Sequence, residues 1–314
     1  MTQVTSALLR TRAFADAKGN PGAQDLMINP RRYGSAPFRV AVVHGGPGAA
    51  GEVAAVAHEL SSDRGVLEPL QTERSLQAQV KELKSQLQES SDPPVTLIGF
   101  SWGAWLSLIL AAQYPHLVSR LVLIGSGPFE QKYVHKIMET RLSRLSRAEG
   151  DEAKGILAAL EDRNDDVDRK NEPEKKEALA RMGELFRRTD AFDPEECEFS
   201  QFDPIADETI SCEPERYEPK WECNSDIYRA VWREATILRQ TGKLLELCKK
   251  VRCPVVAIHG DYDPHPSVGV REPLQAVLKS FQFILLENCG HKPWIEKMAK
   301  GKFYSILREV LNEG

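Results

Sequence analysis

The sequence predicts an α/β fold with a mostly parallel central sheet and helices on both of its faces. Short apolar runs such as Phe38–Val43, Pro94–Ile98 and Leu121–Ile124 alternate with longer stretches of helical character. Strands that are apolar at nearly every position are buried on both faces, which is the environment of a strand in a parallel sheet. The alternation of such strands with helices is typical of an α/β architecture.

The same patterns place the individual elements. Residues 1–37 are turn-rich and are expected to form early strands at the edge of the sheet. The stretch at 73–89 is typical of a charged amphipathic helix, and the helix at 104–114 is expected to end at Pro115. The expected strands are 38–43, 66–68, 94–98, 121–124, 254–258 and 281–286, and the expected helices are 49–60, 73–89, 104–114, 132–146, 152–160, 175–186, 227–238 and 243–250.

Composition limits the classes of function. The 314 residues include 41 basic and 46 acidic ones, for a formal charge of −5, so there is no basic footprint for nucleic acid. No apolar run reaches the roughly 18 residues that cross a bilayer. The amino-terminal segment is interrupted by charges, unlike a secretory signal. We therefore expect a cytoplasmic protein with no nucleic-acid or membrane partner, whose partner is a small-molecule substrate.

The segment Gly99–Gly103 reads Gly-Phe-Ser-Trp-Gly and lies between an apolar strand and a helix. A G-x-S-x-G sequence in that setting is typical of a nucleophile elbow, a sharp turn that lifts the serine hydroxyl clear of the sheet. Glycines on either side of Ser101 allow the strand and the helix to approach closely, because they have no Cβ. Ser101 is therefore the candidate nucleophile.

Two further motifs occur at the ends of other strands. His44-Gly45-Gly46-Pro47-Gly48 follows the strand at 38–43, and Glu287-Asn288-Cys289-Gly290-His291 follows the strand at 281–286. With G-x-S-W-G, these residues make the chain resemble the α/β-hydrolase superfamily, and most closely its proline-iminopeptidase branch. The resemblance covers roughly residues 38–127 and 250–314.

The resemblance implies a catalytic triad in the chain order nucleophile, acid, histidine. Ser101 needs a base within hydrogen-bond reach, and His291 can take its proton and return it to the leaving group. An aspartate on the far nitrogen of His291 would fix the tautomer and stabilise the imidazolium. Asp261 and Asp263 both follow the strand at 254–258, and Asp263 is preferred because it fits the G-x-x-D arrangement of the family.

The oxyanion of the intermediate needs preorganised donors. The resemblance assigns one donor to the backbone N–H of Trp102, directly after the nucleophile. The second donor must come from the 44–48 loop, in which Pro47 has no N–H. Gly46 is preferred over Gly45, and Gly45 is expected to contact the substrate.

The segment between the two halves of the resemblance has a different character. The resemblance implies a core formed by 1–127 and 251–314, with 128–250 inserted as a mainly helical cap over the site. An apolar cavity lined by Trp105, Phe129, Trp221 and Trp232 would suit acyl esters. An aminopeptidase would instead need a carboxylate for the substrate ammonium, and the candidates in the cap are Glu195, Glu196, Glu198, Glu222, Asp226 and Glu234.

These features predict a Ser-His-Asp hydrolase of esters or amides that needs neither a metal nor another cofactor. The string Asp261-Tyr262-Asp263-Pro264-His265 could suggest a metal, but no cluster of further ligands supports it and the acid loop explains it. Two alternatives remain: a proline-iminopeptidase-like aminopeptidase, and a carbon–carbon bond hydrolase on the same triad. The R-G-x-G-x-S segment of the iminopeptidases is reduced here to Arg64-Gly65, which places the esterase slightly ahead.

Overall fold

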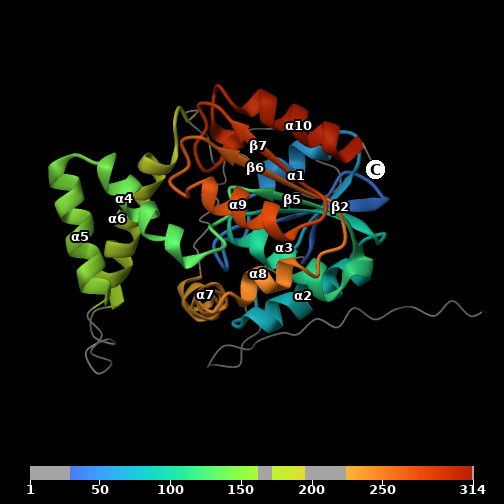
Figure 1. Ribbon diagram of the computed structural model, residues 1–314, viewed down its shortest axis with the longest axis horizontal. Helices are drawn as coiled ribbons and strands as arrows, with labels where there is room; N and C mark the ends of the chain where they lie inside the picture. Colours follow the sequence, from blue (N-terminus) through green and yellow to red (C-terminus); the bar gives the residue numbers. More distant parts are fainter. Residues whose placement is uncertain (1–28, 162–171, 195–223, 313–314) are drawn as a thin grey trace, which may run out of the picture.

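The computed structural model describes residues 29–161, 172–194 and 224–312, and its centre is a sheet in the strand order β1-β3-β2-β4-β5-β6-β7 (Figure 1). Every neighbouring pair of strands is parallel except β1 and β3, which are antiparallel at one edge. The predicted α/β class with a mostly parallel sheet is therefore confirmed. The strands are β1 (Arg31–Tyr33), β2 (Phe38–Val43), β3 (Gly65–Glu68), β4 (Val95–Phe100), β5 (Val118–Ile124), β6 (Val255–Gly260) and β7 (Phe281–Leu286).

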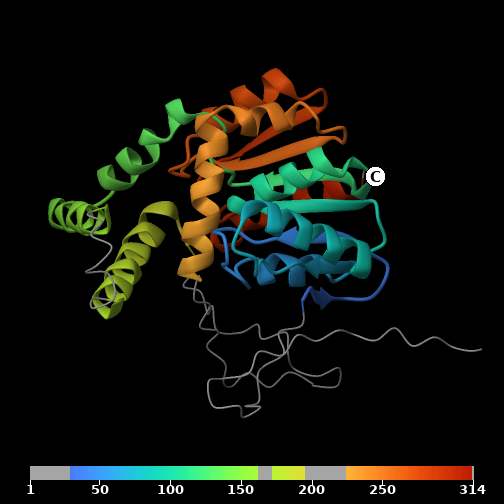
Figure 2. The ribbon, with the colours of Figure 1, turned by 90° about the horizontal axis from the view of Figure 1, so that it is seen from below.

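Helices cover both faces of the sheet, as its apolar strands require (Figure 2). The helices α1 (Ala54–Leu60) and α10 (Lys300–Asn312) bury their apolar side chains on one face. The other face is covered by α2 (Leu76–Ser90), α3 (Trp102–Gln113), α8 (Lys243–Cys248) and α9 (Val268–Val277). The helix α3 is apolar almost all round and is buried from Trp102 to Ala112, so it lies at the centre of this layer.

Most of the expected elements are present, and one difference that concerns the candidate site is the start of the first helix. The sequence predicts a helix over 49–60, but α1 begins only at Ala54. The backbone turns just before it, with positive φ angles of 86° at Gly48 and 89° at Gly51. These left-handed conformations are incompatible with a right-handed helix, and they extend the loop that follows β2.

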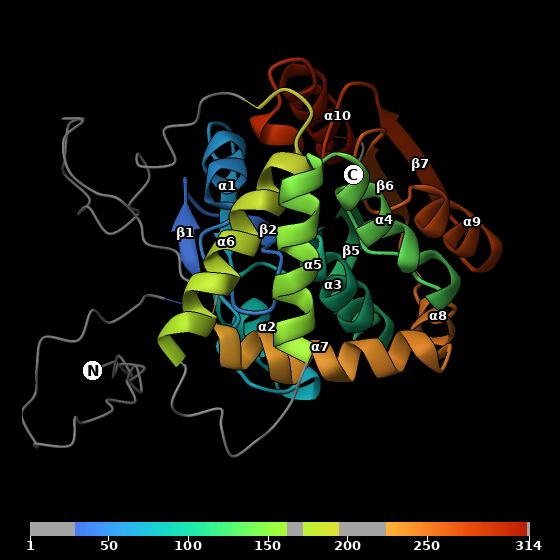
Figure 3. The ribbon, with the colours of Figure 1, turned by 90° about the vertical axis from the view of Figure 1, so that its left-hand side faces the viewer.

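The insertion after β5 contains two groups of helices. The helices α4 (His135–Ser143), α5 (Arg147–Glu161) and α6 (Glu172–Asp190) project to one side of the sheet and pack around a small apolar cluster of their own (Figure 1, Figure 3). In contrast, α7 (Ser225–Gln240) contributes buried side chains to the same apolar cluster as α3. The predicted division of the chain at residues 127 and 251 stays a prediction.

The parallel register brings the carboxyl ends of the central strands to one edge of the sheet. Val43 of β2 pairs with Gly99 of β4, and Phe100 pairs with Ile124 of β5. Ile124 in turn pairs with Ile258 of β6. The loops that carry the glycine, serine, aspartate and histidine motifs therefore all leave the sheet at the same edge.

At that edge, α3 lies against the strands with backbone in contact with backbone. A Cβ on Gly103 would lie 2.3 Å from the carbonyl oxygen of Val43 and 2.5 Å from that of His44. A Cβ on Gly99 would lie 2.3 Å from the carbonyl oxygen of Gly103. Only glycine fits at these two positions, because the obstructing atoms belong to the backbone and cannot rotate away.

We expect Gly103→Ala to lower the free energy of unfolding by roughly 2–3 kcal/mol, because the added methyl group overpacks the contact between α3 and β2. Gly155→Ala is the matched control: Gly155 lies within α5 with nothing in the space its Cβ would occupy. There, alanine should stabilise the helix by up to about 1 kcal/mol. Urea unfolding measures both changes, and equal stability of the two variants would contradict the packing argument.

Candidate active site

Ser101 forms the turn between β4 and α3, with φ 51° and ψ −112°. A side-chain-bearing residue in this region of backbone space is strained by about 1–3 kcal/mol and persists only where the surroundings hold it. Here its N–H donates a hydrogen bond of 2.9 Å to the carbonyl oxygen of Ile124 at the end of β5. The serine is partly exposed although the next eleven residues, Trp102 to Ala112 of α3, are buried.

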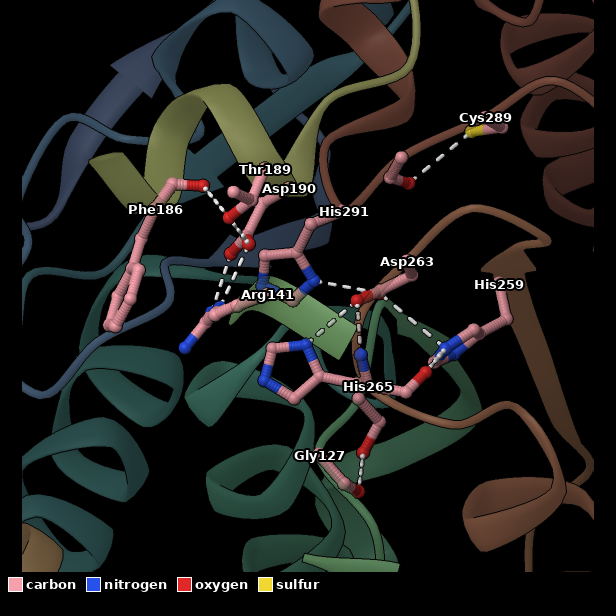
Figure 4. A network of polar contacts seen from close by, with 12 residues as sticks. Gly127, Arg141, Phe186, Thr189, Asp190, His259, Asp263, His265, Cys289 and His291 are labelled. Carbon is pink, nitrogen blue, oxygen red and sulfur yellow. Dashed lines mark hydrogen bonds and ion pairs between the residues drawn. The ribbon is translucent and has the colours of Figure 1, made fainter. Parts of the chain in front are cut away.

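The structure brings Asp263, rather than Asp261, to His291 (Figure 4). Nδ1 of His291 donates to Oδ2 of Asp263 at 2.7 Å. The Asp263 side chain is fully buried. Asp261 is exposed, and its carboxylate instead accepts the backbone N–H of Cys289 at 3.1 Å.

The His291 ring lies among the direct neighbours of Ser101. Its centroid is 4.8 Å from that of Phe100, the residue before Ser101. On its other side is Gly125, which follows Ile124 and at which a Cβ would lie 3.1 Å from Nδ1 of His291. Phe100 and Gly125 thus belong to segments that also hold Ser101.

Asp263 is surrounded by three imidazoles, which the sequence motif alone does not reveal. Its Oδ1 is 2.7 Å from Nδ1 of His265, and its Oδ2 is 3.5 Å from Nε2 of His259. Burial by itself would raise the pKa of Asp263, but the interactions of the carboxylate with His291, His265 and His259 outweigh burial and hold the pKa well below its ordinary value. The carboxylate therefore stays ionised while buried.

The loop after β2 is held by the buried side chain of His44. The Gln71 N–H donates to Nε2 of His44 at 3.1 Å, which leaves Nδ1–H to donate to the Gly45 carbonyl oxygen at 3.0 Å. Burial lowers the pKa of His44 to about 4, so the ring is neutral at neutral pH. In the same loop Gly46 has φ 24°, and its carbonyl oxygen accepts the N–H of Ala49 at 2.9 Å.

An ion pair links this loop region to the residue after His291. Nζ of Lys292 lies 2.8 Å from Oε1 of Glu52. The other oxygen of Glu52 is close to Gly45: a Cβ at that glycine would lie 2.6 Å from it and 2.9 Å from the Phe100 ring. Gly45 is therefore packed between Glu52 and the Phe100 ring.

A buried carboxylate, Glu296, joins the His291 loop to the chain that returns from α6. One of its oxygens accepts the N–H of Gly290 at 2.8 Å and that of Phe192 at 2.9 Å. The other accepts the N–H of Asp193 at 2.7 Å. The His291 N–H in turn donates to the carbonyl oxygen of Asp190 at 2.7 Å. Glu296 thus anchors both the His291 loop and the return segment.

The predicted substrate-binding aromatics lie together, but mostly within the core. Trp105 and Phe129 are 1% and 0% exposed, and the Trp105 ring stacks on that of Trp232 from α7 at 5.8 Å between centroids. Trp232 is partly exposed. Its ring also contacts Trp102, the residue after the nucleophile, at 6.3 Å. Trp221 lies outside the described residues, and the binding role of the others stays a prediction.

Within the described segments, Asp263, His265 and His291 bring possible metal ligands within 4.8 Å of one another. Their hydrogen bonds to one another explain this cluster, because both Nδ1 atoms face the carboxylate.

Of the helices in the described part of the chain, none is long and apolar enough to cross a membrane.

Comparisons with known proteins agree on the fold. A family model described as the alpha/beta hydrolase fold matches residues 61–297. Among solved structures, VinJ superimposes with a TM-score of 0.60 at 15% identity, covering 90% of this chain and 94% of that one. A proline iminopeptidase from Mycobacterium smegmatis gives 0.54 at 16% identity, covering 89% and 91%. A meta-cleavage product hydrolase from Pseudomonas fluorescens IP01 gives 0.54 at 16%, covering 91% and 94%.

A curated relative matches over a short segment only. The pyrrolizixenacetamide deacetylase of Xenorhabdus hominickii is 41% identical over 54 residues, which are 16% of this chain and 20% of that protein. The chain thus matches about a fifth of the length of this relative.

The neutral, buried His44 should make stability depend on pH. The unfolded chain binds a proton on this residue below the ordinary pKa of 6.5, whereas the folded chain does so only below about 4. The free energy of unfolding should therefore fall as the pH drops from 6.5 to 4, by about 3 kcal/mol from this residue. His44→Gln should make the free energy of unfolding depend less on pH in this range. His116→Gln, at an exposed histidine, should leave the dependence unchanged. Urea unfolding from pH 4 to 7 compares them, and an unchanged slope in His44→Gln would refute the assignment.

Proposed function

Because the chain belongs to the α/β-hydrolase family, we propose that it is a serine hydrolase in which Ser101, His291 and Asp263 form a catalytic triad. The superfamily predicted from the two glycine motifs is confirmed by the family match. The observation that carries the proposal is the 2.7 Å hydrogen bond from His291 to the buried Asp263, at the strand edge where the strained Ser101 turn emerges.

The proposed chemistry follows from the tautomer of His291. Asp263 is ionised and can only accept, so the proton of the neutral ring is on Nδ1 and the lone pair is on Nε2. Nε2 takes the proton of the Ser101 hydroxyl as its oxygen attacks the acyl carbon. The imidazolium then protonates the leaving alcohol or amine, which leaves an acyl-enzyme. Water, deprotonated by the same nitrogen, releases the acid and restores Ser101.

The oxyanion of the tetrahedral intermediate is assigned to the backbone donors of Trp102 and Gly46. Trp102 is the first residue of α3, so its N–H has no carbonyl partner within the helix. Gly46 belongs to the loop that His44 holds through its bonds to Gln71 and Gly45. Each such donor contributes roughly 3–4 kcal/mol to lowering the barrier.

For the substrate, we infer a small ester or amide with a largely apolar acyl group. The partly exposed Trp232, stacked on Trp105 and in contact with Trp102, offers an apolar surface beside the nucleophile turn. The deacetylase named above also has a name that describes removal of an acyl group.

An aminopeptidase is the second candidate. It would need a carboxylate for the ammonium of the substrate, and the two described candidates already have partners. Asp226 pairs with Arg229 and Arg74, at 3.3 Å and 3.6 Å. Glu234 accepts the N–H of Leu76 at the start of α2, at 3.0 Å. Both carboxylates are therefore already engaged. The remaining acidic candidates, Glu195, Glu196, Glu198 and Glu222, lie outside the described residues.

The nucleophile assignment predicts that a fluorophosphonate probe labels the protein on Ser101. Ser101→Ala should abolish labelling, because the probe forms its bond with the serine oxygen that His291 activates. Ser107→Ala is the control: Ser107 is fully buried on α3 and should label as the wild type does. Gel fluorescence and peptide mass spectrometry read the result. Full labelling of Ser101→Ala would exclude the proposed mechanism.

Three substrates separate the candidate activities. We expect nitrophenyl butyrate to be cleaved, and a proline arylamide with a free amine to be cleaved no better than its N-acetyl form, since the two described candidates for binding the ammonium, Asp226 and Glu234, are already engaged. Product absorbance gives kcat/KM for each. A strong preference for the free amine would identify the peptidase instead. Labelling of Ser101 without cleavage of any of the three would favour the carbon–carbon bond hydrolase.

A further inference from the structure

We propose that His265 is a positioning residue for the triad: it shares the Asp263 carboxylate with His291 and so limits how strongly His291 acts as a base. This inference rests on the proposed function. It assigns a role to an imidazole that the triad itself does not use.

The two oxygens of Asp263 are divided between two histidines (Figure 4). Oδ2 accepts Nδ1–H of His291 at 2.7 Å, and Oδ1 accepts Nδ1–H of His265 at the same distance. Oδ1 also accepts the backbone N–H of His265 at 2.9 Å. The carboxylate is thus oriented from both sides, and its rotation would break bonds to His265 as well as to His291.

The two imidazoles also lie on each other. Their centroids are 4.5 Å apart with 28° between the ring planes. In the proposed reaction His291 becomes a cation, so the ring stacked on it must remain neutral to avoid two adjacent charges. The face of His265 is therefore part of the immediate surroundings of the imidazolium.

His265 is kept neutral mainly by its burial. Burial, above all, lowers the pKa of His265, and the neighbouring His291 and the Arg141 guanidinium from α4 act in the same direction, whereas Asp263 raises it. Arg141 is itself paired with Asp190, through Nε and Oδ1 at 2.8 Å. His259 completes the surroundings, with Nε2 2.8 Å from the carbonyl oxygen of His265. Neutral His265 then acts only as a donor to Asp263.

A carboxylate that accepts additional hydrogen bonds presents less negative charge to each partner. The bonds from His265 therefore reduce the stabilisation that Asp263 gives to the His291 cation, and they hold the carboxylate in line with Nδ1. Removing the His265 side chain should have two separable effects. The pKa of His291 should rise, and the carboxylate should be less well oriented.

Two variants separate these effects. His265→Phe keeps a flat ring over His291 but removes the donor, and His265→Asn keeps a donor but removes the ring. His116→Asn, at an exposed histidine of the 3₁₀ turn η1 (Pro115–Leu117), is the matched control. The readouts are the pH profile of the rate of fluorophosphonate labelling and the NMR titration of the His291 ring, assigned by comparison with His291→Gln. Circular dichroism establishes that each variant is folded.

For His265→Phe we expect the acid limb of the labelling profile, and the NMR pKa of His291, to move up by about half to one pH unit. The rate of labelling at neutral pH should fall about tenfold. General-base catalysis as a whole contributes about a hundredfold or more, so this loss corresponds to a part of it. His265→Asn should shift the acid limb and the NMR pKa of His291 by less than His265→Phe does. His116→Asn should shift neither of them.

A folded His265→Phe with an unmoved acid limb and an unmoved His291 pKa would overturn the proposal, since a merely structural role lowers rate without moving either. If His265→Phe does not fold, an unmoved His291 pKa in His265→Asn overturns it equally. The NMR titration does not involve Ser101. A failure of the triad, shown by full labelling of Ser101→Ala, is therefore distinguishable from a failure of this inference.

Discussion

The candidate site depends on the close approach of α3 to the ends of β2 and β4. Gly99 and Gly103 leave so little space that a single added carbon at either would lie 2.3 Å from a backbone oxygen. The oxygens in contact with Gly103 belong to Val43 and His44, at the start of the loop that contains Gly46. One packing contact therefore positions both the Ser101 turn and the loop assigned to the oxyanion. A wider separation would move them apart.

Much of the core could be predicted from the sequence because its strands are buried on both faces. The runs at 38–43 and 281–286 agree with β2 and β7 at both ends. The first helix was expected too early, because alanines and apolar residues before Ala54 resemble a helix while Gly48 and Gly51 turn the backbone. Local composition does not reveal which of these tendencies prevails.

The site was predictable as a set of residues, but its contacts were not. Asp261 and Asp263 follow the same strand, and the choice between them depends on a bond from Cys289 to Asp261, 28 residues apart in the chain. The stacking of His265 on His291 likewise joins loops after different strands. The packing of Trp232 on Trp105 joins the insertion to α3. Such contacts are set by tertiary structure and leave no periodic signal in the sequence.

The hydrogen bonds of Glu296 restrict where the chain can gain or lose residues. Its carboxylate binds the backbone of Phe192 and Asp193 as well as that of Gly290, next to His291. An insertion or deletion between Asp190 and Asp193 would therefore displace the histidine loop along with the return segment. A change in the length of the segment between β5 and β6 is better placed away from these residues. The four residues from 190 to 193 should keep a constant length in evolution even where their side chains vary.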